Sequence, residues 1–275
     1  MRLGLLAIVR DEAGNLPRLL ARLEQLERSA AVASLWCSFY ENDSSDDTPV
    51  RLARWLECRS GVLISEQLGV PRLQGRVQAR TERLAWARNR ALEPLLAQSL
   101  DLLLVVDADL DFTVEQVMQL ISVLRVHDTA VMACASALQN VPDLFGHGPS
   151  SYYDTFALLD RGGRRGITHA AVPVWTLEDR AAWLAGRPVP VMAAFGGMAV
   201  MRMATVHQLN LRWNGEQGCE HWAFCIAAGQ AGSVLACPGI NPRIWHDRVP
   251  QWTPAYRAQR RHQLRSLWHH QLLRP

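Results

Sequence analysis

The sequence predicts an α/β protein built on an open, mostly parallel sheet flanked by helices, with a less regular C-terminal half. Three observations predict this fold class. Apolar runs of strand length alternate with segments of helical periodicity through the first half of the chain, at the spacing of βαβ units. The runs are continuously apolar, as in strands that are buried on both faces. The chain has 275 residues, of which 49% are hydrophobic, enough for a large core.

The predicted elements of the first half alternate regularly. Strands are expected at 3–9, 35–40, 62–66, 102–106 and 129–136, and helices at 15–28, 49–57, 80–100 and 113–125. The first helix shows the pattern most clearly, because its leucines recur at helical spacing and Pro17 suits a first turn that Asn15 could cap. The second half is less regular. It holds a Gly- and Arg-rich loop at 146–166, a bend at Phe195-Gly196-Gly197-Met198 and a turn opening a helix at 218–229.

Composition limits the classes of function. The formal net charge of +3 is too close to neutral to indicate nucleic acid as the main partner. The six cysteines include no CxxC pair, and no apolar run reaches the roughly 18 residues of a membrane span. We therefore expect a cytoplasmic protein with reduced thiols.

Polar groups at 10–12, 41–47 and 107–111 each follow a predicted strand, where ligands bind in open α/β sheets. The group Asp107-Ala108-Asp109 directly follows five apolar residues. Paired carboxylates there would suit Mg²⁺ or Mn²⁺, and such a cation would stabilise a departing diphosphate. The alternative is a solvated acidic turn.

The segment from Tyr40 to Thr48 carries a second acidic group. Ser44 or Ser45 as a helix cap would explain the later residues of this segment. It would not explain Glu41 and Asp43, which lie before the helix, at the end of the strand. Carboxylates there could accept hydrogen bonds from a base or a ribose.

Together these patterns resemble the GT-A fold of nucleotide-sugar glycosyltransferases, and most nearly the capsule-associated α-1,3-mannosyltransferase family of fungi and its bacterial relatives. The resemblance covers about residues 3–247. It is carried by the segments 41–48, 87–95, 106–109, 153–156, Phe195-Gly196-Gly197-Met198 and Cys219-Glu220-His221. Fungal members carry an Asn-Asp pair where this chain has Asp-Ala-Asp, which is the general GT-A pattern.

The resemblance implies a role for each matching residue. Donor-binding roles fall on Ile8, Val9, Arg10 and Glu12 (base), Glu41 and Asp43 (base and ribose), Arg88 (diphosphate) and Asp107 (ribose). Asp107, Asp109 and His246 would hold the metal. Glu220 would bind the acceptor or act as its general base, with His221 assisting. The alternatives are a surface arginine at 88, a non-ligand histidine at 246 and a Glu220 favoured only by the helix dipole.

The resemblance also divides the chain. It implies one GT-A domain over 1–250, with a nucleotide-binding half (1–136) and an acceptor half (137–250). The Arg- and His-rich pattern of the tail predicts an amphipathic helix at 251–275. This helix could contact the inner membrane face peripherally.

The predicted function is transfer of a sugar, with mannose as the candidate, from a GDP- or UDP-sugar to a hydroxyl of a glycan or lipid-linked acceptor, with Mn²⁺ or Mg²⁺. One alternative is a sugar nucleotidyltransferase, although the loop at 10–15 has one glycine instead of a Gly-rich motif. The other is nucleic-acid binding through the tail residues Arg257, Arg260, Arg261, His262 and Arg265.

Overall fold

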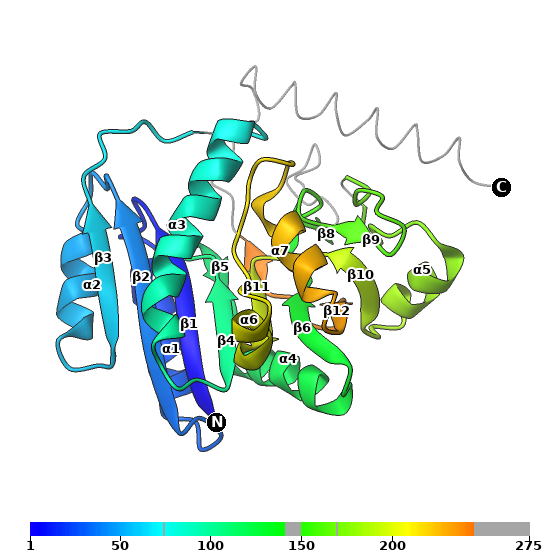
Figure 1. Ribbon diagram of the computed structural model, residues 1–275, viewed down its shortest axis with the longest axis horizontal. Coiled ribbons are helices and arrows are strands. Elements are labelled where there is room, and N and C mark those ends of the chain that lie inside the picture. Colours follow the sequence, from blue (N-terminus) through cyan, green and yellow to red (C-terminus); the bar gives the residue numbers. More distant parts are fainter. Residues whose placement is uncertain (74, 141–149, 169, 245–275) are drawn as a thin grey trace.

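The computed structural model describes residues 1–73, 75–140, 150–168 and 170–244. A nine-stranded sheet with the order β3-β2-β1-β4-β11-β6-β12-β10-β9 crosses the molecule, and helices cover both of its faces (Figure 1). Strands from both 1–136 and 137–250 belong to this sheet. The predicted tail helix and His246 lie outside the described residues.

The first half matches the predicted alternation of strands and helices. Its strands in the large sheet are β1 (Arg2–Val9), β2 (Ser34–Asn42), β3 (Gly61–Glu66), β4 (Leu102–Val106) and β6 (Ala130–Ala135). Its helices are α1 (Leu16–Glu27), α2 (Thr48–Leu56), α3 (Gln78–Leu96) and α4 (Val114–Val126). The strands β3, β2, β1 and β4 are parallel neighbours, so their carboxyl ends meet at one edge of the sheet.

Both faces of the sheet are buried, which explains the continuous apolar strands. In β1, Leu3 and Leu5 pack into the core under α1, α2 and α4, whereas Leu6 packs into the core under α3 and α7. Successive side chains of a strand point to opposite faces. A strand between two helical layers therefore has no polar side.

The second half differs from the prediction in one respect that matters for the site. The region 189–203 is not only a bend, because it forms β10 (Val189–Ala193) and β11 (Met198–Arg202). Strand β11 runs antiparallel between β4 and β6. Parallel pairing therefore holds among the first four strands and between β6 and β12 (Ser233–Cys237), whereas the pairs made by β11 and β10 are antiparallel.

Shorter elements complete the chain. The described part of 146–166, predicted as loop, includes β8 (Ser150–Tyr152) and β9 (Leu159–Asp160). The remaining helices are α5 (Leu177–Leu184), α6 (Met203–Gln208) and α7 (Glu220–Ala228). A four-stranded sheet joins β5 (Leu110–Asp111), β13 (Arg243–Ile244), β7 (Leu138–Asn140) and β8. No helix in the described ranges is both long and apolar enough to span a membrane.

The Gly-Gly bend before β11 depends on its two glycines. Gly196 and Gly197 have φ angles of +63° and +77°, in the left-handed region that favours glycine. A Cβ on Gly196 would lie 1.9 Å from the carbonyl oxygen of Ala135. The bend brings the carbonyl of Gly197 within 2.9 Å of the amide nitrogen of Asp107, so β11 supports the acidic turn.

Candidate active site

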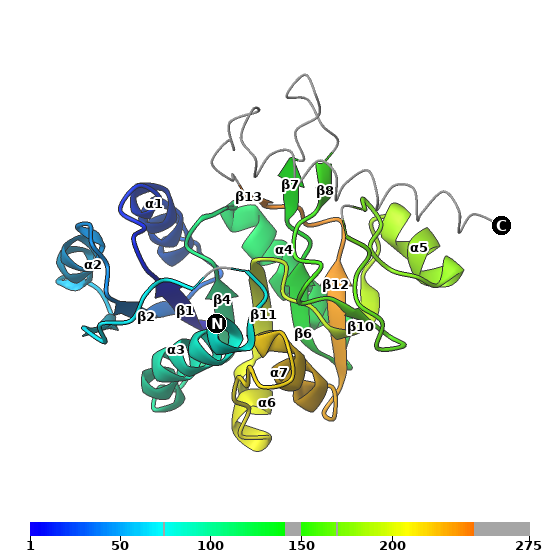
Figure 2. The ribbon, with the colours of Figure 1, turned by 90° about the horizontal axis from the view of Figure 1, so that it is seen from above.

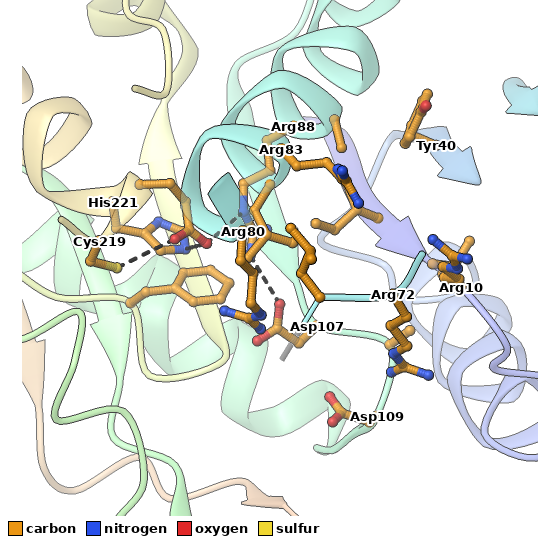
Figure 3. Close-up of a pocket in the computed structure, with 18 of the residues that line it drawn as sticks. Arg10, Tyr40, Arg72, Arg80, Arg83, Arg88, Asp107, Asp109, Cys219 and His221 are labelled. Atoms are coloured by element: carbon orange, nitrogen blue, oxygen red, sulfur yellow. Dashed lines mark hydrogen bonds and ion pairs between the residues drawn. The ribbon is translucent and has the colours of Figure 1, made fainter. Parts of the chain in front are cut away.

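A cavity of about 470 Å³ opens at the carboxyl edge of the first strands (Figure 3). Its lining includes residues of α3 and α7, two helices that lie side by side (Figure 2). Segments far apart in the sequence line the cavity. The end of β1, the turn after β4, the arginine-rich segment from Arg72 to Arg88, the loop at 153–156 and the start of α7 all contribute residues. The predicted polar groups at 10–12 and 107–111 therefore meet here, and the group at 41–47 contributes Asn42. The second half of the chain adds the loop at 153–156, Phe195 and the start of α7.

Most of the predicted site residues meet in this cavity. Its lining includes Ile8, Val9, Arg10, Glu12, Arg88, Asp107, Asp109, Glu220 and His221. Glu41 and Asp43 are not among the lining residues, although their neighbours Tyr40 and Asn42 are. The binding role of each residue stays a prediction.

The carboxylates of Glu41 and Asp43 are occupied by donors of the protein itself. Glu41 is fully buried and accepts hydrogen bonds from the Ser44 amide (2.7 Å) and the Ser65 hydroxyl (2.6 Å). Asp43 accepts from the amide of Gly69 at 2.8 Å. These contacts tie the loops after β2 and β3 together, which favours a structural role over contact with a base or ribose.

The serine-rich segment after β2 does not cap α2 as considered above. The N-cap of α2 is Asp47, without a side-chain cap hydrogen bond. Instead, the hydroxyls of Ser44 and Thr48 accept hydrogen bonds from the amides of Asp11 (3.0 Å) and Glu12 (2.8 Å). The segment therefore holds the loop after β1, which carries Arg10 and Glu12 into the cavity.

Arg88 links the two ends of the site and is not a surface arginine. It is only 3% exposed, and its Nη2 donates to Asp107 Oδ1 at 3.2 Å (Figure 3). Its Nε lies 3.7 Å from Glu220 Oε1, and its guanidinium lies 4.9 Å from the centre of the Phe195 ring. Within the described residues, Nε and Nη1 have no hydrogen-bond partner.

Burial and mutual repulsion raise the pKa values of the carboxyl groups around the acidic turn. Burial raises the pKa of Asp107 to about 6, against the opposing effect of Arg88. Burial, and then the charge of Glu12, raises the pKa of Asp109. Burial also raises the pKa of Glu12. A cation at this place would relieve the repulsion between the carboxylates.

The described residues suit a cation that takes some of its ligands from the protein and the others from a bound substrate. They include no group of three His, Cys, Asp or Glu side chains able to hold a metal by themselves. Asp107 and Asp109 supply two carboxylates, which are hard oxygen ligands suited to Mg²⁺ or Mn²⁺. Strand β13 ends at Ile244, which pairs with Leu110 beside Asp109.

Six arginines line the cavity, and residue patterns in the sequence did not point to most of them. Besides Arg10 and Arg88, the lining includes Arg72, Arg76, Arg80 and Arg83 (Figure 3). Their recurrence every three or four residues was a readable signal, because a diphosphate ligand requires several cations. Arg83 Nη1 donates to the carbonyl of Pro71 at 2.7 Å, which braces this segment against α3.

Asp154 is a partly buried carboxyl group that lines the cavity. It accepts hydrogen bonds from the amides of Ala157 (3.2 Å) and Gly196 (3.1 Å), and so ties its loop to the Gly-Gly bend. Burial, and then the charge of Asp107, raises the pKa of Asp154 to about 7. It can therefore carry a proton near neutral pH.

Comparison with known proteins decides the family. The family model described as Cryptococcal mannosyltransferase 1 matches residues 5–227, well over half of the chain. The chain belongs to the Cryptococcal mannosyltransferase 1 family. The match includes every described residue that was predicted for the site, and it confirms the family resemblance. No curated protein sequence gives a significant match.

Solved structures confirm the GT-A fold for this member of the Cryptococcal mannosyltransferase 1 family. One is the mannosyltransferase PcManGT from Pyrobaculum calidifontis in complex with GDP-Man and Mn²⁺, with 14% identity and a TM-score of 0.55 over 100% of this chain and 65% of that one. Another is S. aureus TarS 1-349, with 12% identity and a TM-score of 0.52 over 89% and 60%. Its complex with UDP-GlcNAc gives a TM-score of 0.53 at 12% identity, over 97% and 66%. The chain thus spans somewhat less than two thirds of the length of these proteins.

Proposed function

We propose that this protein transfers a sugar from a nucleoside-diphosphate sugar to an acceptor hydroxyl, with the help of Mn²⁺ or Mg²⁺. A GDP-sugar with mannose is the first candidate donor, a UDP-sugar the second, and a glycan or lipid-linked molecule the acceptor. One observation carries the proposal. In a chain of the Cryptococcal mannosyltransferase 1 family, the paired carboxylates Asp107 and Asp109 line the same cavity as six arginines, at the carboxyl edge of the sheet.

The carboxylates of Asp107 and Asp109 support a metal bound together with the diphosphate. Asp109 would be the main protein ligand, and Asp107 would serve the metal or the ribose. His246, two residues after β13 ends beside Leu110, is the candidate third ligand. When bound, the cation would neutralise charge that develops on the leaving diphosphate. PcManGT, a protein of the same fold, was solved with GDP-Man and Mn²⁺.

The chain's own residues would bind and orient the two substrates. Arg88 and the other arginines that line the cavity would hold the phosphate oxygens, to which a guanidinium offers paired donors. Glu220 would receive the proton of the acceptor hydroxyl while that oxygen bonds to the anomeric carbon. At the same centre, the bond between carbon and the diphosphate oxygen breaks, and the nucleoside diphosphate leaves.

The nucleotidyltransferase and nucleic-acid alternatives have less support. The family match favours glycosyl transfer, and neither the loop after β1 nor the cavity offers a Gly-rich phosphate loop. The tail arginines on which the nucleic-acid alternative depends lie outside the described residues.

A thermal-shift panel tests the donor assignment. GDP, UDP, GDP-mannose and UDP-GlcNAc would each be added with and without Mn²⁺. A ligand at about one hundred times its Kd stabilises the fold by about 2.7 kcal/mol, so specific binding raises the melting temperature measurably. We expect one diphosphate nucleotide to do so only with Mn²⁺, and we expect Asp109→Asn to abolish the effect. If no member of the panel raised the melting temperature, that result would overturn the proposal.

The cytoplasmic location and the peripheral membrane contact are proposals from the sequence alone. The segment 253–275 is rich in Arg and His at amphipathic spacing. We expect the full chain to pellet with vesicles that contain anionic lipid, and a chain lacking 253–275 to stay in the supernatant. Equal pelleting of the two would remove the membrane contact from the proposal.

A further inference from the structure

The buried histidine beside Glu220 has a hydrogen-bond arrangement that fixes which of its nitrogens carries the proton. His221 is 3% exposed, and its Nδ1 lies 3.3 Å from Trp213 Nε1. An indole nitrogen only donates, so Nδ1 must accept and cannot carry a proton. The second ring nitrogen, Nε2, must therefore carry the single proton of a neutral ring.

The surroundings of the ring are consistent with this neutral state. His221 stacks on Phe195 with ring centres 4.1 Å apart, and the edge of Trp213 faces it. Among the described groups, Glu220 Oε1 lies 3.7 Å from Nε2, Arg88 pairs with the same carboxylate oxygen, and the thiol of Cys219 donates to Glu220 Oε2. Burial, and then the positive charge of Arg88, lowers the pKa of His221 well below its ordinary value.

The free N–H of the histidine points to the carboxylate that the proposed function uses. Nε2 has no hydrogen-bond partner among the described residues, and it lies 3.7 Å from Glu220 Oε1. That separation is slightly longer than a hydrogen bond. Contacts of this kind often shorten when a substrate binds. Arg88 Nε lies 3.7 Å from the same oxygen, so two N–H donors converge on one carboxylate oxygen.

A chain of contacts from α3 holds the indole that sets the tautomer. The Asn89 side chain makes two hydrogen bonds of 2.9 Å with the backbone of Trp213, one from its amide nitrogen and one to its carbonyl oxygen. The Trp213 ring stacks on Phe224 of α7 at 4.2 Å. Arg88 and Asn89, which are adjacent on α3, thus both act on the pair Glu220 and His221. Arg88 reaches Glu220 directly, and Asn89 fixes Trp213, which fixes His221.

We propose that His221 is a positioning residue, a neutral Nε2–H donor held in one tautomer by Trp213, which orients the carboxylate of Glu220 and does not itself accept the acceptor's proton. The catalytic consequence rests on the proposed function. The tautomer does not, because it follows from contacts within the protein. This assignment replaces the predicted role of His221 as an assisting base with that of a donor.

Histidine side-chain NMR tests the tautomer without any substrate. Two-bond ¹H–¹⁵N spectra of the full chain would show up to nine histidine patterns, and the one lost in His221→Gln belongs to residue 221. We expect a bare Nδ1 and a protonated Nε2, unchanged between about pH 5 and pH 8, where an ordinary histidine titrates. A proton on Nδ1, or a titration midpoint in that range, would overturn the proposal.

Matched tryptophan variants test what holds the tautomer. Trp213→Phe keeps a ring against Phe224 but removes the indole donor. We expect the His221 pattern then to become a mixture of tautomers or to titrate in the same pH range. Trp183→Phe is the control, because its indole donates to the carbonyl of Ala171 away from the cavity and its loss should leave the pattern unchanged. An unchanged pattern in Trp213→Phe would contradict the proposal.

A rescue series separates a donor from a base. A glutamine at 221 can present an N–H near the position of Nε2, whereas a phenylalanine keeps the ring and offers no donor. For GDP release from GDP-mannose with Mn²⁺, we expect His221→Phe to lower kcat by about 10- to 100-fold with KM little changed. We expect His221→Gln to recover most of that loss. Equal loss in two variants that melt like the parent would reject the donor role. If the parent protein did not release GDP, GDP-mannose would be the wrong sugar donor. The NMR result would still decide the tautomer of His221.

Discussion

At the residue scale, the site is organised around one buried cation among several carboxyl groups. Arg88 contacts Asp107 and Glu220 and is almost fully buried. Removing one partner of a buried ion pair leaves the other charge without compensation, which costs more than the pair itself contributes. This explains why an arginine that sequence patterns could assign to a helix surface is instead central to the site.

Arg88→Met should therefore destabilise the protein by about 3 kcal/mol, because it leaves Asp107 and Glu220 without their shared counter-ion. Urea unfolding at neutral pH measures the change in free energy. Arg90→Met is the control, since the salt bridge of Arg90 with Glu66 is half exposed and contributes little. Similar losses in the two variants would show that Arg88 has no special role in the acidic cluster.

The buried carboxyl group of Asp154 should make stability depend on pH. Because burial raises its pKa to about 7, the folded protein holds this proton more tightly than the unfolded chain does. The contribution of Asp154 to the free energy of unfolding is complete at low pH and disappears as the pH rises through about 7. The free energy of unfolding should therefore fall by about 2 kcal/mol between about pH 5 and pH 8 from this group, with Asp107 adding in the same direction.

Asp154→Asn checks the origin of this dependence. The amide keeps the shape of the carboxyl group but cannot ionise, so the fall in stability over that pH range should shrink. Urea titrations of both proteins at several pH values give the comparison. A parent protein that becomes more stable as the pH rises would contradict the assignment.

At the element scale, local pattern predicted the regular strands and helices, and long-range pairing decided the rest. Continuous apolar runs and leucine periodicity located β1 to β4 and α1 to α4 to within a few residues. Strand β11 could not be placed in this way. Its position between β4 and β6 depends on hydrogen bonds to strands about 65 to 100 residues away in the chain, which no local pattern encodes.

The bend before β11 should tolerate no side chain at Gly196. Gly196→Ala places a Cβ against the carbonyl oxygen of Ala135 in a left-handed backbone conformation, and should cost at least about 2 kcal/mol. Gly14→Ala is the matched control, because a Cβ there would have nothing within 4 Å. Thermal or urea unfolding of the two variants measures the difference. Equal stability would mean that the bend is not the rigid support of the acidic turn described here.

At the scale of the whole molecule, the edge of the sheet where the site lies was predictable, but the full membership of the site was not. The carboxyl ends of parallel strands meet by topology, so the grouping of Arg10, Glu12, Asp107 and Asp109 followed from strand order alone. The placement of Glu220 and His221 rested on family resemblance. The roles of Glu41 and Asp43 could not be separated from ligand binding without knowing their hydrogen-bond donors.

In the proposed function, the cavity cleaves a nucleoside-diphosphate sugar at its sugar–phosphate bond with the help of a metal ion. Phosphorus NMR of the products formed by the full chain from GDP-mannose or UDP-GlcNAc tests this most directly, for reactions run with and without Mn²⁺ and beside the Asp109→Asn variant. The paramagnetic Mn²⁺ is removed on a chelating resin before the spectra are taken. We expect release of the intact nucleoside diphosphate from one donor, dependent on Mn²⁺ and lost in Asp109→Asn. Cleavage between the two phosphorus atoms, or release that persists without metal and in the variant, would contradict it.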